Sequence, residues 1–252
     1  MLLAIDVGNT HVVIGLFDGE RLLRSWRISS RREMTADELL VLFAGLLGEH
    51  VDGIDDAVVG SVVPPLTASL VEALHALTGS SPLEVAPGVR TGLRIRADNP
   101  QEVGADRILN AVAAHARHSG PVIIVDFGTA TTLDVVTPDA EYLGGIITPG
   151  PRLGAEALSL RAARLPRVDL SVPARVVGRN SVDAIRSGLL HGHAAMVDGL
   201  VRRIEAEVGP ARTVVVTGGL ADVIAPLMER VDANEPDLTL EGLRLVHARN
   251  RG

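Results

Sequence analysis

Two short acidic segments carry the residue types whose spacing is best suited to chemistry. The segment Asp6-Val7-Gly8-Asn9-Thr10 stands between two apolar runs, and its pattern returns 120 positions later as Asp126-Phe127-Gly128-Thr129-Ala130. Glycine tolerates positive φ and lets backbone N–H groups approach a phosphate, while a carboxylate can hold the accompanying cation. A lone Asp-x-Gly is usually a structural turn. Because there are two copies in register, they predict two loops for a nucleoside triphosphate and its metal ion.

The repeat extends beyond the acidic segments. In each copy an apolar run precedes the carboxylate, a second run follows it and a third comes after a turn; the runs are 2–5, 12–17 and 22–28, then 122–125, 131–136 and 142–147. This pattern predicts three adjacent strands at the start of each half. We therefore expect two domains, 1–118 and 119–252, with Ser119-Gly120-Pro121 at the junction and the acidic loops facing each other across a cleft.

Helix signals follow the three strands in both halves. Thr35 and Glu38 form a capping box that opens a helix to Gly48, and Asn99 with Pro100 predicts a helix from there to about His118. Further helices are expected over 66–77 and 153–160, from Asn180-Ser181 to Val208, and after Gly218-Gly219. Strands are expected over 57–60, 93–95 and 213–217. Three strands followed by helices, twice over, indicate an α/β protein of duplicated ribonuclease-H-like domains with an interdomain ATP cleft.

The helix that begins at Ser181 shows two apolar faces. One contains Val182, Ile185, Leu189, Met196, Leu200, Ile204 and Val208, and the other contains Leu190, Ala194, Val197 and Val201. A small domain has little use for both faces, so one of them is expected to meet its copy in a twofold-symmetric homodimer. The alternative is a helix buried centrally in its own domain.

Composition excludes several classes of function. All 24 basic residues are arginine, so neither a P-loop kinase nor a protein kinase, each of which needs a lysine, is possible. The absence of cysteine excludes disulfides, thiolate metal sites and a cysteine nucleophile. A net charge of −7 and few aromatic residues argue against a nucleic-acid partner. No apolar run approaches the ~20 residues of a membrane span and there is no basic leader, so we expect a cytoplasmic protein with no membrane partner.

Five segments of the chain form a recognisable set: Asp6 to Thr10, Asn99-Pro100 leading to Gly104-Ala105-Asp106-Arg107, Asp126 to Thr131, Gly144-Gly145 with Thr148-Pro149-Gly150, and Gly178-x-Asn180-Ser181. In this order and at this spacing they resemble the type III pantothenate kinases, a family within the acetate and sugar kinase, actin and heat-shock chaperone superfamily. The resemblance extends from residue 2 to about 229. Gly-Ala-Asp-Arg combined with two Asp-x-Gly loops is specific to the family.

The resemblance implies ATP-dependent phosphorylation of the primary hydroxyl of pantothenate to 4'-phosphopantothenate, the first step of coenzyme A synthesis, by a homodimer. It implies Asp106 as the catalytic base, Asp6 near Mg²⁺, and Asp126 as ligand of a monovalent cation, K⁺ or NH₄⁺. Gly218-Gly219 stands where the superfamily cradles adenosine. The implied ATP-binding residues are Asp6, Val7, Gly8, Asn9, Thr10, His11, Val12, Val13 and Thr129, and the implied substrate-binding residues are Gly104, Ala105, Asp106, Arg107 and Ser181.

Two residues depart from the family pattern. Ser181 replaces the usual threonine and keeps its hydroxyl, whereas Ala97 stands where many members place a tyrosine in the pantothenate pocket. Asp106 at the edge of a packed helix face suits a rigid carboxylate, and Arg107 suits pairing with a substrate carboxylate. A solvated Asp-Arg pair near a helix start is the structural alternative.

Other interpretations remain at this point. Ser181 competes with Asn180 as helix cap, and His191 with His193 is a poor metal pair that suits a structural role. A regulatory or binding protein on the same scaffold is the rival function, which intact Asp6, Asp106 and Asp126 argue against. A ribonuclease-H-like nuclease is a third, although its acids would have to converge from one domain.

Overall fold

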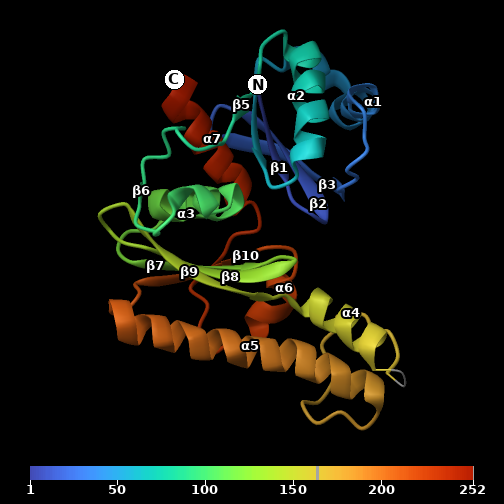
Figure 1. Cartoon of the computed structure of the whole chain (residues 1–252), viewed down its shortest axis with the longest axis vertical. Helices are drawn as coiled ribbons and strands as arrows, with labels where there is room; N and C mark the ends of the chain where they lie inside the picture. Colours follow the sequence, from blue (N-terminus) through green and yellow to red (C-terminus); the bar gives the residue numbers. More distant parts are fainter. Residues whose placement is uncertain (163–164, 252) are drawn as a thin grey trace. The chain divides into compact units, whose positions relative to one another are not determined.

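A computed structural model describes residues 1–162 and 165–251 as an α/β protein with two sheets (Figure 1). The chain forms two compact units. Unit 1 comprises Met1–Leu93, Ala97–Ala113 and Asp237–Gly252, and unit 2 comprises Arg94–Arg96 and Ala114–Pro236. This division differs from the predicted boundary at residue 118, because the chain returns to unit 1 for its last helix.

The two sheets have the same strand order. In unit 1 the order is β3 (Arg21–Ser29), β2 (His11–Asp18), β1 (Leu2–Val7), β4 (Asp56–Ser61) and β5 (Leu83–Glu84). In unit 2 it is β9 (Glu141–Pro149), β8 (Ala130–Val136), β7 (Val122–Phe127), β10 (Thr213–Thr217) and β11 (Ala233–Asn234), with β6 (Arg94–Ile95) added beside β9. The first strand of each unit is antiparallel to the second and parallel to the fourth. The predicted duplication is therefore confirmed.

The duplication extends to an irregularity in the second hairpin strand. The register of β2 with β3 skips Leu23, and the register of β8 with β9 skips Leu143, 120 positions later. A β-bulge of this kind bends the strand and increases its twist. Its presence at equivalent positions shows that both sheets are built on the same backbone plan.

The helices occupy the segments that the periodicity predicted, with some shifts at their ends. The α-helices are α1 (Ala36–Leu47), α2 (Pro64–Thr78), α3 (Ala105–Arg117), α4 (Pro151–Arg161), α5 (Ser181–Val208), α6 (Ala221–Ile224) and α7 (Leu238–Arg251). Short 3₁₀ turns cover Gly48–Gly53, Pro100–Glu102 and Ala225–Leu227. The capping box of α1 is formed as predicted, since Glu38 N–H donates to the Thr35 hydroxyl and Thr35 N–H donates to the Glu38 carboxylate.

The start of α3 differs from the prediction. Asn99 accepts a hydrogen bond from Gln101 N–H at 3.3 Å, but it caps the 3₁₀ turn Pro100–Glu102. The α-helix begins only at Ala105, so Asp106 lies in its first turn. The cap and proline signals thus marked a turn that leads into the helix.

One face of the unit 1 sheet is covered by α1 and α2 (Figure 1). Alternate residues of the strands point into this core, as the period of two requires. Leu3, Ile5 and Val7 of β1 pack there with Phe43 of α1 and Leu70 of α2, all nearly inaccessible to solvent. The strand carrying Asp6 is therefore held rigidly up to the acidic residue.

The other face of this sheet is packed by α7 at positions where glycine permits close approach. A Cβ at Gly15 of β2 would lie 2.8 Å from Leu240, and a Cβ at Gly242 of α7 would lie 2.2 Å from the carbonyl of Leu109 in α3. The sequence predicted one final helix directly after Gly218-Gly219. That position holds only the four-residue α6, and a further helix, α7, belongs to unit 1.

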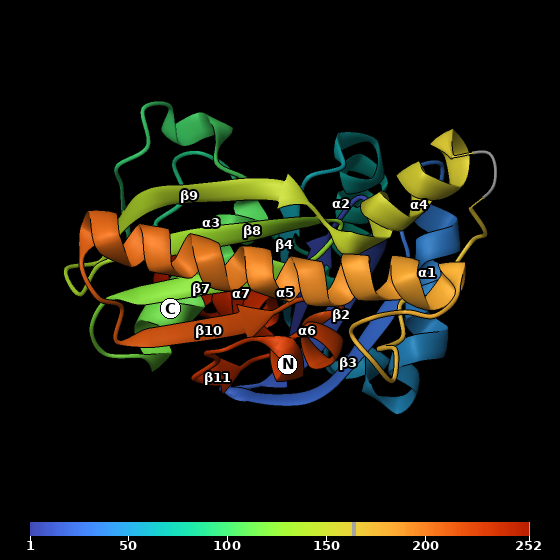
Figure 2. The same cartoon turned by 90° about the horizontal axis from the view of Figure 1, so that it is seen from below.

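In unit 2 the long helix α5 runs along one face of the sheet (Figure 2). Leu190, Ala194, Val197 and Val201 are buried against residues of β7, β8 and β10. Of the two apolar faces predicted for this helix, this one therefore packs within its own unit. A helix that covers a single sheet must bury this stripe within its own unit.

Each unit contains a hairpin turn with a residue in the left-handed region. Gly19 between β2 and β3 has φ 58°, and Ala140 between β8 and β9 has φ 59°. The turns contain Asp18-Gly19-Glu20 and Asp139-Ala140-Glu141, so the residue with positive φ is glycine in the first turn and alanine in the second. An alanine Cβ is strained at this φ, whereas glycine is not.

The Ala140→Gly variant should therefore be more stable by about 0.5–1 kcal/mol, because relief of strain outweighs the added chain entropy of the unfolded state. Denaturant unfolding monitored by circular dichroism measures the change. The matched control, Gly19→Ala, should lower stability by about 1 kcal/mol. An Ala140→Gly variant no more stable than the wild type, or a Gly19→Ala variant no less stable, would show that the turn concerned is not under the strain that its φ indicates.

Candidate functional site

The first acidic loop lies at the carboxyl end of β1 in unit 1. Asp6 is half-buried and pairs in register with Gly60 of the parallel strand β4. Beyond it, Gly8 N–H donates to the His11 carbonyl at 2.9 Å and closes the turn, which leaves Asn9 and Thr10 exposed. A turn of this shape presents backbone N–H groups beside a fixed carboxylate, the arrangement that phosphate and its cation require.

Asp106 belongs to the same unit and is fixed by its neighbours. Its Oδ1 accepts a hydrogen bond from Arg107 N–H at 2.9 Å, and a Cβ built on Gly104 would lie only 2.5 Å from that oxygen. One turn later, Leu109 packs against Gly60, where a Cβ would lie 2.7 Å from the leucine side chain. The second turn of α3 is thus placed against the strand that pairs with Asp6, and the half-buried carboxylate is kept in one position.

In unit 2, the turns at Gly150 and Gly218 both lie against the second acidic loop. Gly150 N–H donates to the Thr129 carbonyl at 3.1 Å, and a Cβ at Gly150 would lie 2.5 Å from that oxygen. A Cβ at Gly218 would lie 2.3 Å from Asp126 Oδ1 and 2.6 Å from Phe127 N. The predicted adenosine turn Gly218-Gly219 therefore lies directly beside Asp126, because β10 pairs with β7 up to Thr217 and Asp126.

The start of α5 resolves the competition between Asn180 and Ser181. Asp183 N–H donates to Asn180 Oδ1 at 2.9 Å, so Asn180 is the N-cap and Ser181 is the exposed first helical residue. Gly178 lies flat against this turn, where a Cβ would be 2.3 Å from Ala184 N. In the Gly-x-Asn-Ser motif, the glycine therefore permits close packing and the asparagine caps the helix. The serine hydroxyl is not part of the cap.

Among the described residues, no group of three or more His, Cys, Asp or Glu side chains could hold a metal ion by itself. Mg²⁺ bound with a nucleotide does not need such a cage, since it keeps several waters and takes one or two carboxylates together with phosphate oxygens. Asp6, at the carboxyl end of β1, fits that role.

The other residues that the sequence analysis singled out differ in their exposure to solvent. Val12 is buried in the core of unit 1, and Val13 is half-buried. Ala97 is half-buried just after β6. His193 is buried and His191 is half-exposed on the same helix, which agrees with a structural role and not with a metal pair.

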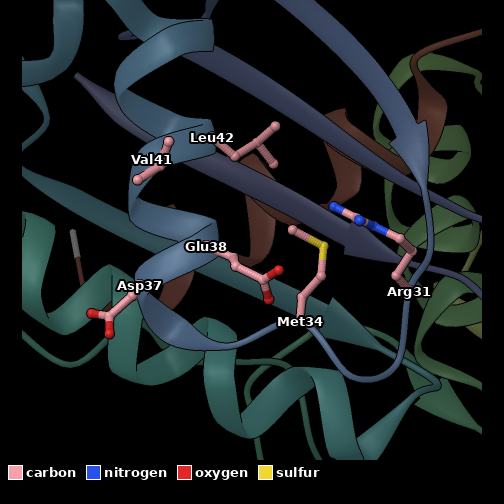
Figure 3. A pocket seen from close by; sticks show the side chains of 6 residues that line it. All are labelled: Arg31, Met34, Asp37, Glu38, Val41 and Leu42. Carbon is pink, nitrogen blue, oxygen red and sulfur yellow. The ribbon is translucent and has the colours of Figure 1, made fainter.

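A separate hollow of about 420 Å³ lies on unit 1 beside α1 (Figure 3). Met34 and Leu42 form its apolar part, Arg31 extends over it, and Glu38 is held by the capping box. It is lined by Arg31, Met34, Asp37, Glu38, Val41 and Leu42. None of these residues belongs to the predicted site, so the hollow was not part of the chemistry predicted from the sequence.

The duplicated sheets define the ribonuclease-H-like kinase architecture, and solved structures agree. A ROK family glucokinase from Streptomyces griseus, in complex with glucose and AMPPNP, is similar over 99% of both chains, with a TM-score of 0.52 and 14% identity. A protein from Campylobacter jejuni described as a Baf family transcriptional activator is similar over 98% of both chains, with a TM-score of 0.63 and 19% identity. Likeness at these identities shows the fold alone.

Sequence comparison defines the family. The model of the type III pantothenate kinases matches residues 2–203. Type III pantothenate kinases from Moorella thermoacetica and Geobacter sulfurreducens are each 48% identical, over 99% and 100% of this chain and 100% of their own length. The chain belongs to the type III pantothenate kinase family. These comparisons give no support to the regulatory interpretation.

None of the described helices combines the length and apolar character that crossing a bilayer requires.

The contact between Gly104 and the Asp106 carboxylate leads to a prediction. Gly104→Ala should lower turnover about tenfold or more with ATP affinity nearly unchanged, because the added methyl displaces a carboxylate placed for the transition state. Steady-state kinetics with calorimetric ATP binding measures both quantities. Gly45→Ala on α1 is the matched control, since a Cβ there meets nothing within 4 Å. Unchanged turnover in Gly104→Ala would contradict the assignment of Asp106.

Proposed function

We propose that this chain transfers the γ-phosphoryl group of ATP to the primary hydroxyl of pantothenate, which gives 4'-phosphopantothenate. The observation that carries the proposal is the pair of Asp-x-Gly turns at the carboxyl ends of equivalent strands, in a chain that belongs to the type III pantothenate kinase family. This reaction is the first step of coenzyme A synthesis. Phosphoryl transfer depends mainly on positioning and charge stabilisation, which fixed loops and a rigid carboxylate supply.

Asp106 is proposed as the general base. Its position in the first turn of α3, fixed through Gly104 and Arg107 N–H, suits a carboxylate that takes the proton from the pantothenate hydroxyl. Arg107 is proposed to pair with the carboxylate of pantothenate, which a guanidinium can bind through two hydrogen bonds. Gly104 and Ala105 would line the same pocket, and Ser181 would reach the substrate from the N-terminus of α5, where N–H groups favour anions.

ATP is proposed to bind through both acidic loops. Residues 6–13 would hold its phosphates from unit 1, and Thr129 would contact it from unit 2. Asp6 would lie near Mg²⁺, which, when bound with ATP, neutralises the charge of the phosphate oxygens. Asp126 would instead hold a monovalent cation, K⁺ or NH₄⁺, for which oxygen ligands are suitable. The position of its carboxylate supports this assignment, because a Cβ built on Gly218 would lie 2.3 Å from Oδ1 and 2.6 Å from Phe127 N, so the oxygen lies close to peptide groups.

The direct test is a coupled assay of ADP release with pantothenate, Mg²⁺ and K⁺. The wild type should turn over well above an ATP-only blank, and Asp106→Asn should reduce turnover roughly 10²- to 10⁴-fold with ATP binding nearly unchanged. The amide keeps the size of the side chain but cannot accept the proton. Folded wild-type protein without pantothenate-dependent turnover would refute the function, and near-normal turnover in Asp106→Asn would place the base elsewhere.

Asp126→Ala should abolish the response to potassium. The variant removes the proposed carboxylate ligand, so its rate in sodium should equal its rate in potassium. Rates over a titration of each salt at constant ionic strength measure this response, with the wild type as reference. A variant that still depends on potassium as the wild type does would place the cation at another site.

A homodimer is proposed as the active unit. Exposed apolar side chains, rather than the two apolar faces of α5, support this proposal. Helix α4 lies beside the first half of α5 (Figure 2), and both α4 and the segment before α5 carry exposed apolar side chains. They are Leu153, Leu158 and Leu160 of α4, and Val172, Val176 and Val177 of the segment before α5. Exposed apolar side chains on neighbouring segments are typical of a protein interface.

Leu160→Glu should shift the protein from dimer to monomer, because the charge would be buried in the interface. Val41→Glu is the matched control, since Leu160 and Val41 are both 75% exposed and Val41 lies on unit 1. Sedimentation velocity at assay concentration distinguishes the states. Wild-type protein that is fully active at the chain mass of 26.5 kDa would refute the dimer.

A further inference from the structure

A buried histidine of α5 contacts the hairpin that carries the second acidic loop. His193 is 9% exposed and Thr131 is inaccessible to solvent. The His193 Nε2 and Thr131 Oγ1 atoms are 2.8 Å apart, within hydrogen-bonding distance. The ring of Phe127 lies on the same histidine, with centroids 6.0 Å apart and an interplanar angle of 59°. One side chain thus contacts both strands of the β7–β8 hairpin.

These contacts fall at the base of the loop. Phe127 and Thr131 are partners in the register of β7 with β8, and they are the last pair before the turn Gly128–Thr129–Ala130. Asp126 immediately precedes this pair. Fixing the two arms at this point limits how the exposed turn can move relative to Asp126, because a short hairpin turn inherits its orientation from its closing pair.

The chemistry of the contact suits a fixed, uncharged anchor. Burial lowers the pKa of the His193 imidazole, so the ring is neutral near neutral pH. A neutral imidazole has one donor and one acceptor nitrogen, and a threonine hydroxyl can complement either at Nε2. Breaking such a bond would leave a buried polar group without its partner, which costs more than the bond contributes when both groups are satisfied.

We propose that His193 is a positioning residue that holds the second acidic loop in its ATP-binding conformation through Thr131 and Phe127, without itself touching substrate. The inference rests on the proposed function only in taking this loop as an ATP site. It also gives α5, the helix that begins with Ser181, a direct connection to the nucleotide loop. The alternative is a histidine that stabilises the core and has no effect on the loop.

Three variants separate these roles. His193→Phe keeps a ring against Phe127 but loses the hydrogen bond, Thr131→Val loses the same bond from the other side, and His193→Gln keeps a polar group able to reach Thr131. His193→Phe and Thr131→Val should raise the KM for ATP roughly 5- to 20-fold, with the KM for pantothenate changed less than about twofold. The double variant should be no worse than either single one, and His193→Gln should largely restore ATP affinity.

The control is His191→Phe, two residues away and half-exposed on the same helix, which should leave the KM for ATP unchanged. Calorimetric binding of ATP with Mg²⁺, in the absence of pantothenate, tests the inference separately from the reaction. If the wild type binds ATP but phosphorylates nothing, the proposed function fails and the ATP affinities of the variants still decide this inference. Variants that unfold more readily yet bind ATP normally, or a wild type that does not bind ATP, would overturn it.

Discussion

The structure depends on close approach of backbone to the two acidic residues at the carboxyl ends of parallel strand pairs. Asp6 pairs in register with Gly60, and the carboxylate of Asp126 lies where a side chain at Gly218 would be 2.3 Å away. A Cβ at Gly218 would clash with that carboxylate, and a Cβ at Gly60 would lie 2.7 Å from the Leu109 side chain. Pairing of the parallel strands sets their register. It therefore brings three features to the same edge of each sheet: the acidic residue, the turn that follows it and the neighbouring glycine.

This arrangement explains how a chain without lysine can serve as a kinase. Each loop supplies backbone donors and one carboxylate, and the strands behind it are buried β-branched and aliphatic residues that hold it still. Asp106 and Arg107 are then proposed to provide the groups that act on the acceptor substrate. The fold is shared with a ROK family glucokinase at 14% identity, and the specificity for the acceptor is proposed to lie in the helix that follows Gly104.

Much of the architecture could be predicted from the sequence, since the in-register repeat at Asp6 and Asp126 fixes three strands in each half. Other features depend on contacts that no local pattern encodes. Asn99 and Pro100 are sound cap signals, yet they begin a 3₁₀ turn. The return of α7 to unit 1 depends on Gly15 and Gly242, whose missing side chains admit distant residues. The sequence alone did not show that Leu190 and Val201 cover a sheet of their own unit, because that sheet is assembled from other segments.

The central claim is that both acidic loops bind the same ATP. Amide hydrogen exchange, followed by mass spectrometry with and without Mg²⁺ and a non-hydrolysable ATP analogue, tests it most directly. The account predicts slower exchange at residues 6–10, at 126–131 and at Gly218-Gly219, with a common midpoint when the nucleotide is titrated. Protection confined to one loop, or protection of the two loops at different nucleotide concentrations, would contradict it.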